Sequence, residues 1–197
     1  MEKYIVTINR QFGSLGRPIA KKMSEILDIE YYDRDIVEKV SKEMDLPVSL
    51  VSDEEESTGK FFKMQFPLGT GNGNAQNKIF EAQQNVIATL AGKGSCIIVG
   101  RCSDHILRNE PNLTRIFIYA SEEMRLKNCV ESLNMDPDEA KKMIRNVDKA
   151  RDSYHMRYAK YLPGDFDHND IMIDSSVLGT EGTAVFLADF IKSRLKG

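Results

Sequence analysis

The sequence predicts an α/β protein whose parallel sheet is covered by helices on both faces. Five short, apolar, β-branched runs alternate along the chain with segments in which apolar residues recur at helical spacing. Strands that are apolar throughout, rather than on alternate residues, are typical of parallel sheets buried on both sides. The 197 residues are enough for one domain with a real core.

The first strand is predicted at Tyr4–Ile8 and the second at Ile29–Tyr32. Between them, apolar residues recur at helical spacing from Pro18, which suits the first turn of a helix because no amide hydrogen is needed there. A second helix is predicted at Asp33–Met44, and Asp33 is a candidate for its N-cap.

A long helix is predicted at Asn74–Ala91, followed by a buried third strand at Ser95–Gly100. The fourth strand is predicted at Leu113–Ala120, and Ser121 is placed to cap the helix after it. The remaining predicted elements are a highly charged helix from Asp136 to about Tyr161, a fifth strand at Asp170–Ser176 and a closing helix at Glu181–Leu195.

The stretch Ser52–Gln76 carries an acidic run and then a cluster of glycine and asparagine. Its GTGNGN sequence does not complete a GxGxxG pattern and follows no predicted strand. We expect a flexible surface segment there rather than a second phosphate loop.

Composition excludes several classes of protein. A net charge of −3 argues against a general nucleic-acid binder, and no apolar run approaches the roughly 20 residues that span a bilayer. The three cysteines form no CxxC pattern, so neither a zinc site nor a disulfide framework is expected. The first strand begins too early to leave room for a signal peptide. We therefore expect a cytoplasmic protein with no nucleic-acid or membrane partner.

The turn between the first strand and the first helix has the glycine spacing of a phosphate-binding loop. Gly13 and Gly16 allow a tight backbone, and Arg17 stands where such loops carry lysine. The pattern GxxxxGK[ST] is not completed, because Gln11 replaces the first glycine and Pro18 replaces the hydroxyl residue. A strand, a glycine turn and a helix in this order still direct backbone amides and the helix dipole at an anion. The alternative is a tight turn with solvated arginines.

Arginine can pair with a phosphate through two parallel hydrogen bonds, which lysine cannot do. Arg10 adds a second cation, and Ser14 is the hydroxyl nearest in sequence to stand in as a metal ligand. The predicted phosphate-binding residues are Arg10, Gly13, Ser14, Leu15, Gly16, Arg17 and Pro18.

Three segments resemble the cytidylate-kinase-like family of P-loop proteins. They are VTINRQFGSLGRPIAKKMSEILDIEYYDRDIV from Val6, IIVGRCSDHIL from Ile97, and VDKARDSYHMRYAKYL from Val147 together with the later DIMIDSS. The resemblance implies a three-layer α/β/α P-loop NTPase fold with a five-stranded parallel sheet, a helical acceptor-binding region and a basic lid. It also implies ATP, Mg²⁺ and a small-molecule nucleotide acceptor.

On this basis we expect one domain with a core at 1–33, 93–144 and 168–197. The acceptor-binding insertion would occupy about 34–92 and the lid about 145–163, and both regions would move to admit substrate. Cytidylate kinases carry GK and a small residue in the loop, where this chain has Gly16, Arg17 and Pro18. Their third strand ends in a DGRD-like sequence, where this chain reads VGRC from Val99.

Charged residues follow the second and third strands. Asp33 and Asp35 are candidate Mg²⁺ ligands together with Ser14, and a capping role for Asp33 is compatible with this. Arg101 is expected to hold the phosphate of the acceptor, the alternative being an exposed arginine. Asp104 is placed to pair with Arg101 or to approach the metal.

The predicted lid carries Arg145, Arg151 and Arg157, which would point about 120° apart on a regular helix. They cannot all reach one phosphate, and Arg151 is the one expected to reach ATP. The alternative is a solvated charged helix. The histidines His105 and His155 are expected to be packing or surface residues. The predicted catalytic residues are Arg17, Asp33, Arg101, Arg151 and Arg157.

Together these features predict an ATP-dependent phosphotransferase acting on a small acceptor, such as the nucleoside monophosphate CMP. The alternative is a nucleotide-binding regulatory module with a degenerate loop and little or no turnover. The missing lysine and hydroxyl of the loop favour that alternative.

Overall fold

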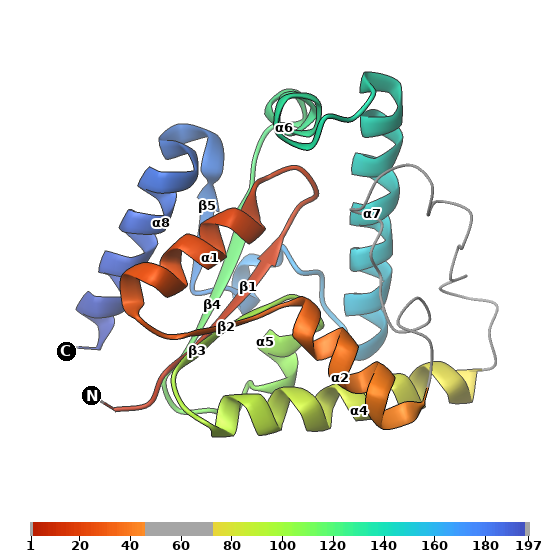
Figure 1. The fold of residues 1–197 in the computed structure, drawn as a ribbon, viewed down its shortest axis with the longest axis vertical. Coiled ribbons are helices and arrows are strands. Elements are labelled where there is room, and N and C mark those ends of the chain that lie inside the picture. Colours follow the sequence, from red (N-terminus) through yellow and green to blue (C-terminus); the bar gives the residue numbers. More distant parts are fainter. Residues whose placement is uncertain (1, 46–72, 196–197) are drawn as a thin grey trace.

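The computed structural model describes residues 2–45 and 73–195. Its sheet has five parallel strands in the order β2-β3-β1-β4-β5, which confirms the predicted number, direction and class (Figure 1). The strands are β1 (Ile5–Arg10), β2 (Glu30–Tyr32), β3 (Cys96–Val99), β4 (Leu113–Tyr119) and β5 (Ile171–Asp174).

Helices connect the strands in every described crossover. They are α1 (Gly16–Leu27), α2 (Arg34–Met44), α4 (Gly73–Gly92), α5 (Ser103–Ile106), α6 (Glu122–Leu133), α7 (Pro137–Tyr158) and α8 (Ser175–Arg194), with a short 3-10 turn at Phe166–His168. Ser121 caps α6 as predicted, since its side chain accepts a hydrogen bond from the amide of Met124.

Two apolar clusters form the layers on either side of the sheet (Figure 1). On one face, α1 and α8 pack over β1 and β4, with Ile19 and Leu187 among the buried residues. On the other face, α2 and α4 cover β2 and β3, with Val40 and Ile87 in the core. Both faces are therefore apolar, which is why the strands lack polar alternation.

A third cluster lies between α6 and α7, outside these two layers. Its centre is Phe12, which is 1% exposed and packs with Cys129, Ile144 and Val147. Phe12 belongs to the turn that follows β1, so the apolar packing of α6 and α7 fixes the beginning of the candidate phosphate loop.

Three details of the elements differ from expectation. The closing helix begins at Ser175, immediately after β5, and not at Glu181 as predicted. The sequence pattern did not indicate its first turn because Gly179, with φ 65°, interrupts the helix there. Helix α7 ends at Tyr158, and Lys160 takes a positive φ of 71° shortly after it. The one-turn helix α5 was not predicted because it is too short to show periodicity.

Most of the predicted flexible segment lies outside the described residues, since 46–72 are not among them, and its last residues, 73–76, open α4. The three cysteines are buried and unbridged. Among the described helices, none combines the length and the apolar character that a membrane crossing requires.

Candidate functional site

The loop after β1 leads into a helix whose first turn is open to an anion. Leu15 occupies the N-cap position with φ 59° and makes no capping hydrogen bond through its side chain. The first turn of α1 contains no acidic residue. Because the first amides of a helix have no partners within the helix and carry its positive end, this arrangement favours a bound phosphate.

Ser14 is built into the interior instead of facing the loop. It is 0% exposed, and its Oγ lies 3.0 Å from the carbonyl oxygen of Gln11 and 3.1 Å from that of Ile118. Its own carbonyl accepts a hydrogen bond of 2.7 Å from Ser175 Oγ. This geometry runs against the prediction that Ser14 is a metal ligand, because the hydroxyl is enclosed by carbonyl groups of the sheet edge.

Arg17 and Asp33 connect the start of α1 to the end of β2. Arg17 Nε lies 2.5 Å from Asp33 Oδ2, and Asp33 is 4% exposed. Tyr31 donates its hydroxyl to the same carboxylate over 3.3 Å; burial first, and then the Asp33 charge, raises the pKa of Tyr31. Asp33 stands at the N-cap position of α2, as predicted, but its side chain makes no capping hydrogen bond.

The carboxylate of Asp33 is a reasonable partner for a metal or a metal-bound water. Its Oδ1 is buried and has no hydrogen-bond partner among the described residues. The side chain of Asp35 lies outside what the structure describes. The described residues contain no cluster of three or more acidic, histidine or cysteine ligands. A Mg²⁺ ion would therefore need phosphate oxygens and waters as further ligands, which is its usual preference.

Arg10 crosses the space between the loop and the end of β3. A Cβ atom on Gly16 would lie 2.7 Å from Arg10 Cβ, and one on Gly100 would lie 2.5 Å from Arg10 Nη1. The close approach of Arg10 therefore requires glycine at position 16, whereas Gly100 is required by its own φ of 71°. Next along the chain, Arg101 has φ 61° and is only 8% exposed, so the alternative of an exposed arginine is wrong.

The arginines of α7 point in different directions, as the helical spacing predicts. Arg151 Nη1 donates to the carbonyl oxygen of Arg10 over 3.2 Å and so faces the end of β1. Arg157 instead donates to Gln76 and Asn77 of α4. Arg145 is exposed and lies 3.9 Å from Glu122. The structure thus brings Arg151 to the candidate site and directs Arg157 away from it.

Asp148 of α7 fastens the beginning of the loop and was not predicted. Its Oδ1 accepts a 2.7 Å hydrogen bond from the amide of Phe12, and its Oδ2 accepts one of 2.5 Å from Arg125. Arg125 also donates to the carbonyl oxygen of Phe12 over 3.3 Å. An isolated aspartate in a charged helix gives no sequence signal for this role.

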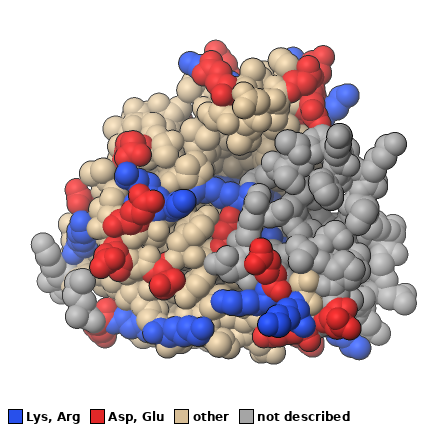
Figure 2. All heavy atoms as spheres, viewed as in Figure 1, with Lys and Arg blue, Asp and Glu red and all other residues tan. Residues whose placement is uncertain are grey.

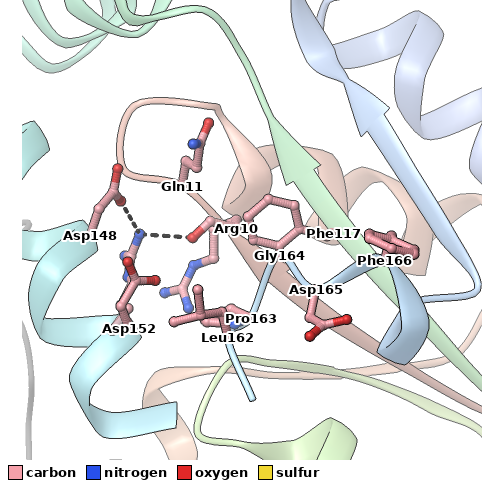
Figure 3. Close-up of a pocket in the computed structure, with 11 residues that line it drawn as sticks. Arg10, Gln11, Phe117, Asp148, Asp152, Leu162, Pro163, Gly164, Asp165 and Phe166 are labelled. Carbon is pink, nitrogen blue, oxygen red and sulfur yellow. Dashed lines mark hydrogen bonds and ion pairs between the residues drawn. The ribbon is translucent and has the colours of Figure 1, made fainter. Parts of the chain in front are cut away.

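A cavity of about 400 Å³ opens between α7 and residues 162–166 (Figure 3). It is lined by Arg10, Arg151 and Phe117 of β4, among others. Asp152 of α7 also lines it, and burial, followed by the nearby charge of Asp148, raises the pKa of Asp152. The cavity therefore joins the loop end of β1 to α7.

A buried ion pair at the end of β3 was also missed. His155 Nε2 lies 3.0 Å from both carboxylate oxygens of Asp104, and Tyr161 donates its hydroxyl to Asp104 over 2.9 Å. Burial alone raises the pKa of Asp104, but the hydrogen bonds and charge of His155 outweigh it and lower that pKa. Burial lowers the pKa of His155, and Asp104 more than reverses this and raises it.

Aromatic side chains join α7 to α4. The rings of Phe80 and Tyr158 stack with centroids 3.9 Å apart, and Tyr154 donates its hydroxyl to Gln83. The predicted lid helix is therefore in contact with the helix that the resemblance assigns to the acceptor region.

Basic side chains are concentrated locally. Figure 2 shows a band of lysine and arginine across the middle of the visible face, over α1, with acidic groups above and below it. A band of this kind in a chain of net charge −3 suits a small anion better than a long polyanion.

A family model, the cytidylate kinase-like family, matches residues 5–177, which is most of the chain and includes every residue of the site above. The chain belongs to this family. A comparison with curated proteins finds no match.

Solved structures agree with the family's fold. An uncharacterized protein from Eubacterium ventriosum is 27% identical, with 99% of each chain covered and a TM-score of 0.71. A shikimate kinase from Bacteroides thetaiotaomicron is 9% identical, with 97% of this chain and 99% of the other covered and a TM-score of 0.57. A shikimate kinase from Acinetobacter baumannii, in complex with shikimate, is 12% identical, with 98% and 93% covered and a TM-score of 0.52.

These likenesses confirm the fold class. This chain has the α/β fold and the 2-3-1-4-5 strand order of P-loop kinases similar to nucleoside-monophosphate kinases. The likeness to the shikimate kinases concerns the fold alone.

Proposed function

We propose that this protein transfers the γ-phosphoryl group of ATP to a small acceptor, a nucleoside monophosphate such as CMP. The observation that carries the proposal is the gathering of arginines from three segments, β1, α1 and α7, around the carboxyl end of β1. Arg10 approaches the glycines of both the loop and the β3 turn, Arg151 bonds to the Arg10 carbonyl, and Arg17 opens α1. Phosphoryl transfer depends mainly on such positioning and charge neutralisation.

In this proposal each residue has a separate role. The first amides of α1, with Arg10 and Arg17, hold the phosphates of ATP. Arg101 holds the phosphate of the acceptor, and Arg151 approaches the transferring group. Asp33 orients Mg²⁺ or one of its waters through its buried Oδ1, and the ion supplies charge neutralisation on the phosphates when it is bound.

The pairing of Arg17 with Asp33 is compatible with this division. In the ligand-free protein, Asp33 keeps the Arg17 guanidinium next to the helix N-terminus. A bound phosphate offers Arg17 a second anionic partner, so the side chain needs little reorientation. Arg157, predicted as catalytic, has its donors on α4, and we propose that it stabilises the contact between α4 and α7.

A second candidate function is nucleotide sensing with little turnover. It is favoured by the enclosure of Ser14 and by Pro18, which together leave the described loop without a side-chain hydroxyl for Mg²⁺. A loop of this kind can still bind nucleotide through its amides and arginines.

The test combines calorimetry with ATP alone and assays of ADP formation with Mg²⁺ and a panel of nucleoside monophosphates. We expect ATP to bind and one acceptor to accelerate ADP release well above the rate in its absence. Arg17→Ala should weaken ATP binding by about tenfold or more and slow ADP release, whereas Lys21→Ala, which changes an exposed residue of the same helix, should do neither. ATP binding without turnover on any acceptor would favour the sensing function. No ATP binding would refute both.

A further inference from the structure

Arg151 lies on α7 between two points at which that helix is fastened to the candidate site. One turn before it, Asp148 accepts the amide of Phe12 at the start of the loop. One turn after it, His155 pairs with Asp104, which follows β3. Residues three or four positions apart share a face of a helix, so all three side chains project toward the same edge of the sheet.

The second of these contacts is the buried ion pair of His155 and Asp104. The side chains of His155 and Asp104 are each 3% exposed. His155 Nε2 faces the carboxylate, and its Nδ1 lies 2.9 Å from the carbonyl oxygen of Tyr161. An ionised carboxylate and a carbonyl only accept hydrogen bonds, so a hydrogen on each ring nitrogen satisfies both contacts. The raised pKa of His155 and the lowered pKa of Asp104 favour this imidazolium form.

The surroundings of the pair favour this state. Asp104 also accepts hydrogen bonds from Asn9 of β1 and from the Tyr161 hydroxyl. Asp152, on the same helix as His155, adds a second negative charge near the imidazolium. His105 of α5 also interacts electrostatically with His155, the Tyr161 ring lies against the His155 ring, and Arg115 of β4 interacts electrostatically with Asp104. The cluster therefore joins the ends of β1 and β3 to α7.

The reach of Arg151 depends on this arrangement. Its Nη1 meets the Arg10 carbonyl over 3.2 Å, and a shift of α7 away from the sheet would break that contact. Asp148 limits such a shift on one side of Arg151 and the Asp104–His155 pair limits it on the other.

We propose that Asp104 and His155 are positioning residues that hold α7 so that Arg151 reaches the phosphate-binding end of β1. The identity of the ligand, ATP, rests on the proposed function. The placement of Arg151 is a property of the free protein and is testable without any ligand.

The test uses the double variant Asp104→Asn/His155→Gln. Either single change leaves a buried charge without its partner, which is strongly destabilising, whereas the double change removes both charges and keeps groups that can form a hydrogen bond. The matched control is Met156→Gln, because Met156 is the next residue of α7 and is 44% exposed. Far-UV circular dichroism and thermal unfolding establish that each variant is folded.

The first readout is the Arg151 Nε–H signal in ¹⁵N NMR relaxation of the ligand-free protein, assigned by its loss in Arg151→Ala. We expect an ordered side chain in the parent and in Met156→Gln, and a mobile one in the double variant. A double variant that is folded and keeps Arg151 as ordered as in the parent overturns the proposal. If the double variant does not fold, Tyr161→Phe, which removes one hydrogen bond to Asp104, must increase the mobility of Arg151 relative to the control.

The second readout is a thermodynamic cycle measured by ATP calorimetry. In the parent, Arg151→Ala should weaken ATP binding by about tenfold, as expected for the loss of a hydrogen bond between charged groups. In the double variant the same change should alter affinity by less than about twofold, within the range of independent effects. An equal loss in both backgrounds overturns the proposal. If the parent binds no ATP, the proposed function fails, and the NMR readout alone decides on the positioning of Arg151.

Discussion

The proposed phosphate binding by the loop depends above all on Arg17. It occupies the place of the usual lysine, and its guanidinium is held by the buried carboxylate of Asp33 over 2.5 Å. A planar guanidinium can keep this contact and still present further donors to a phosphate, whereas an ammonium group is a point charge. We propose that the arginine, held by the aspartate, takes the role of the lysine of a standard loop.

Replacing Arg17 by alanine should weaken ATP binding by about tenfold or more, because a charge-assisted hydrogen bond contributes on the order of 1.5–3 kcal/mol. Arg17→Lys should keep part of the affinity but should not yield a strong kinase, since Pro18 still supplies no hydroxyl for the metal. Calorimetry with ATP checks both variants. Parent-like affinity in Arg17→Ala would show that the loop is not the phosphate site.

Residue positions at strand ends were predictable, but their partners were not. Arg10, Arg17 and Arg101 follow predicted strands or begin a predicted helix, and the parallel topology places them at one edge. The contacts of Asp148 with Phe12 and of Asp104 with His155 join residues far apart in the chain. Side-chain pairs across such separations leave no periodic pattern, so the sequence indicated neither.

Among the elements, α7 has the largest share in the proposed mechanism. It packs on α6 through the cluster around Phe12, on α4 through stacked aromatic rings, and on the end of β3 through His155. Its helical character was predictable from charge and spacing. Its three separate contacts were not, because they depend on where α4 and α5 lie in the fold.

Helix α7 should open more readily than the sheet, since a lid must admit and then enclose its ligand. We expect backbone amides at 145–158 to exchange hydrogen faster than those of β1 and β4, and to slow when ATP is added. Mass-spectrometric hydrogen exchange measures both. Exchange in α7 as slow as in the central strands, with no response to ATP, would contradict its assignment as a lid.

In the whole molecule, the sheet order and the two apolar layers follow from patterns that the sequence displays openly. Local exceptions to these patterns were not predictable from the sequence. Gly179 breaks α8 with a positive φ, and Arg101 and Cys102 take left-handed conformations that only glycine adopts without strain. Tertiary packing imposes these local backbone conformations.

The stability of the fold should depend on pH through the Asp104–His155 pair. The pKa of His155 is raised, so its contribution is complete below the unfolded value near 6.5 and is lost as pH rises through the higher folded value. The pKa of Asp104 is lowered, so its contribution is present above about 3.9 and is lost as pH falls through the lower folded value.

Urea unfolding across this range should show the free energy of unfolding of the parent falling above neutral pH relative to Asp104→Asn/His155→Gln. Met156→Gln should follow the parent, because it leaves the pair intact. Parallel pH curves for the parent and the double variant would contradict an ionised pair.

The close approach of Arg10 to Gly16 and Gly100 also limits which mutations can restore a lost binding site. A Cβ on Gly100 would meet the guanidinium, the far end of a flexible chain, whereas a Cβ on Gly16 would meet the Cβ of Arg10 itself. A loss of nucleotide binding caused by Gly16→Ala should therefore not be suppressed by shortening position 10 to alanine, and Arg10→Gly is the change that clears the clash. In a selection for restored ATP binding, revertants of Gly16→Ala should restore the glycine, because Arg10→Gly clears the clash but also removes an arginine that the proposal assigns to phosphate binding. Arg10 thus makes position 16 intolerant of any side chain, while position 100 requires glycine because of its left-handed backbone.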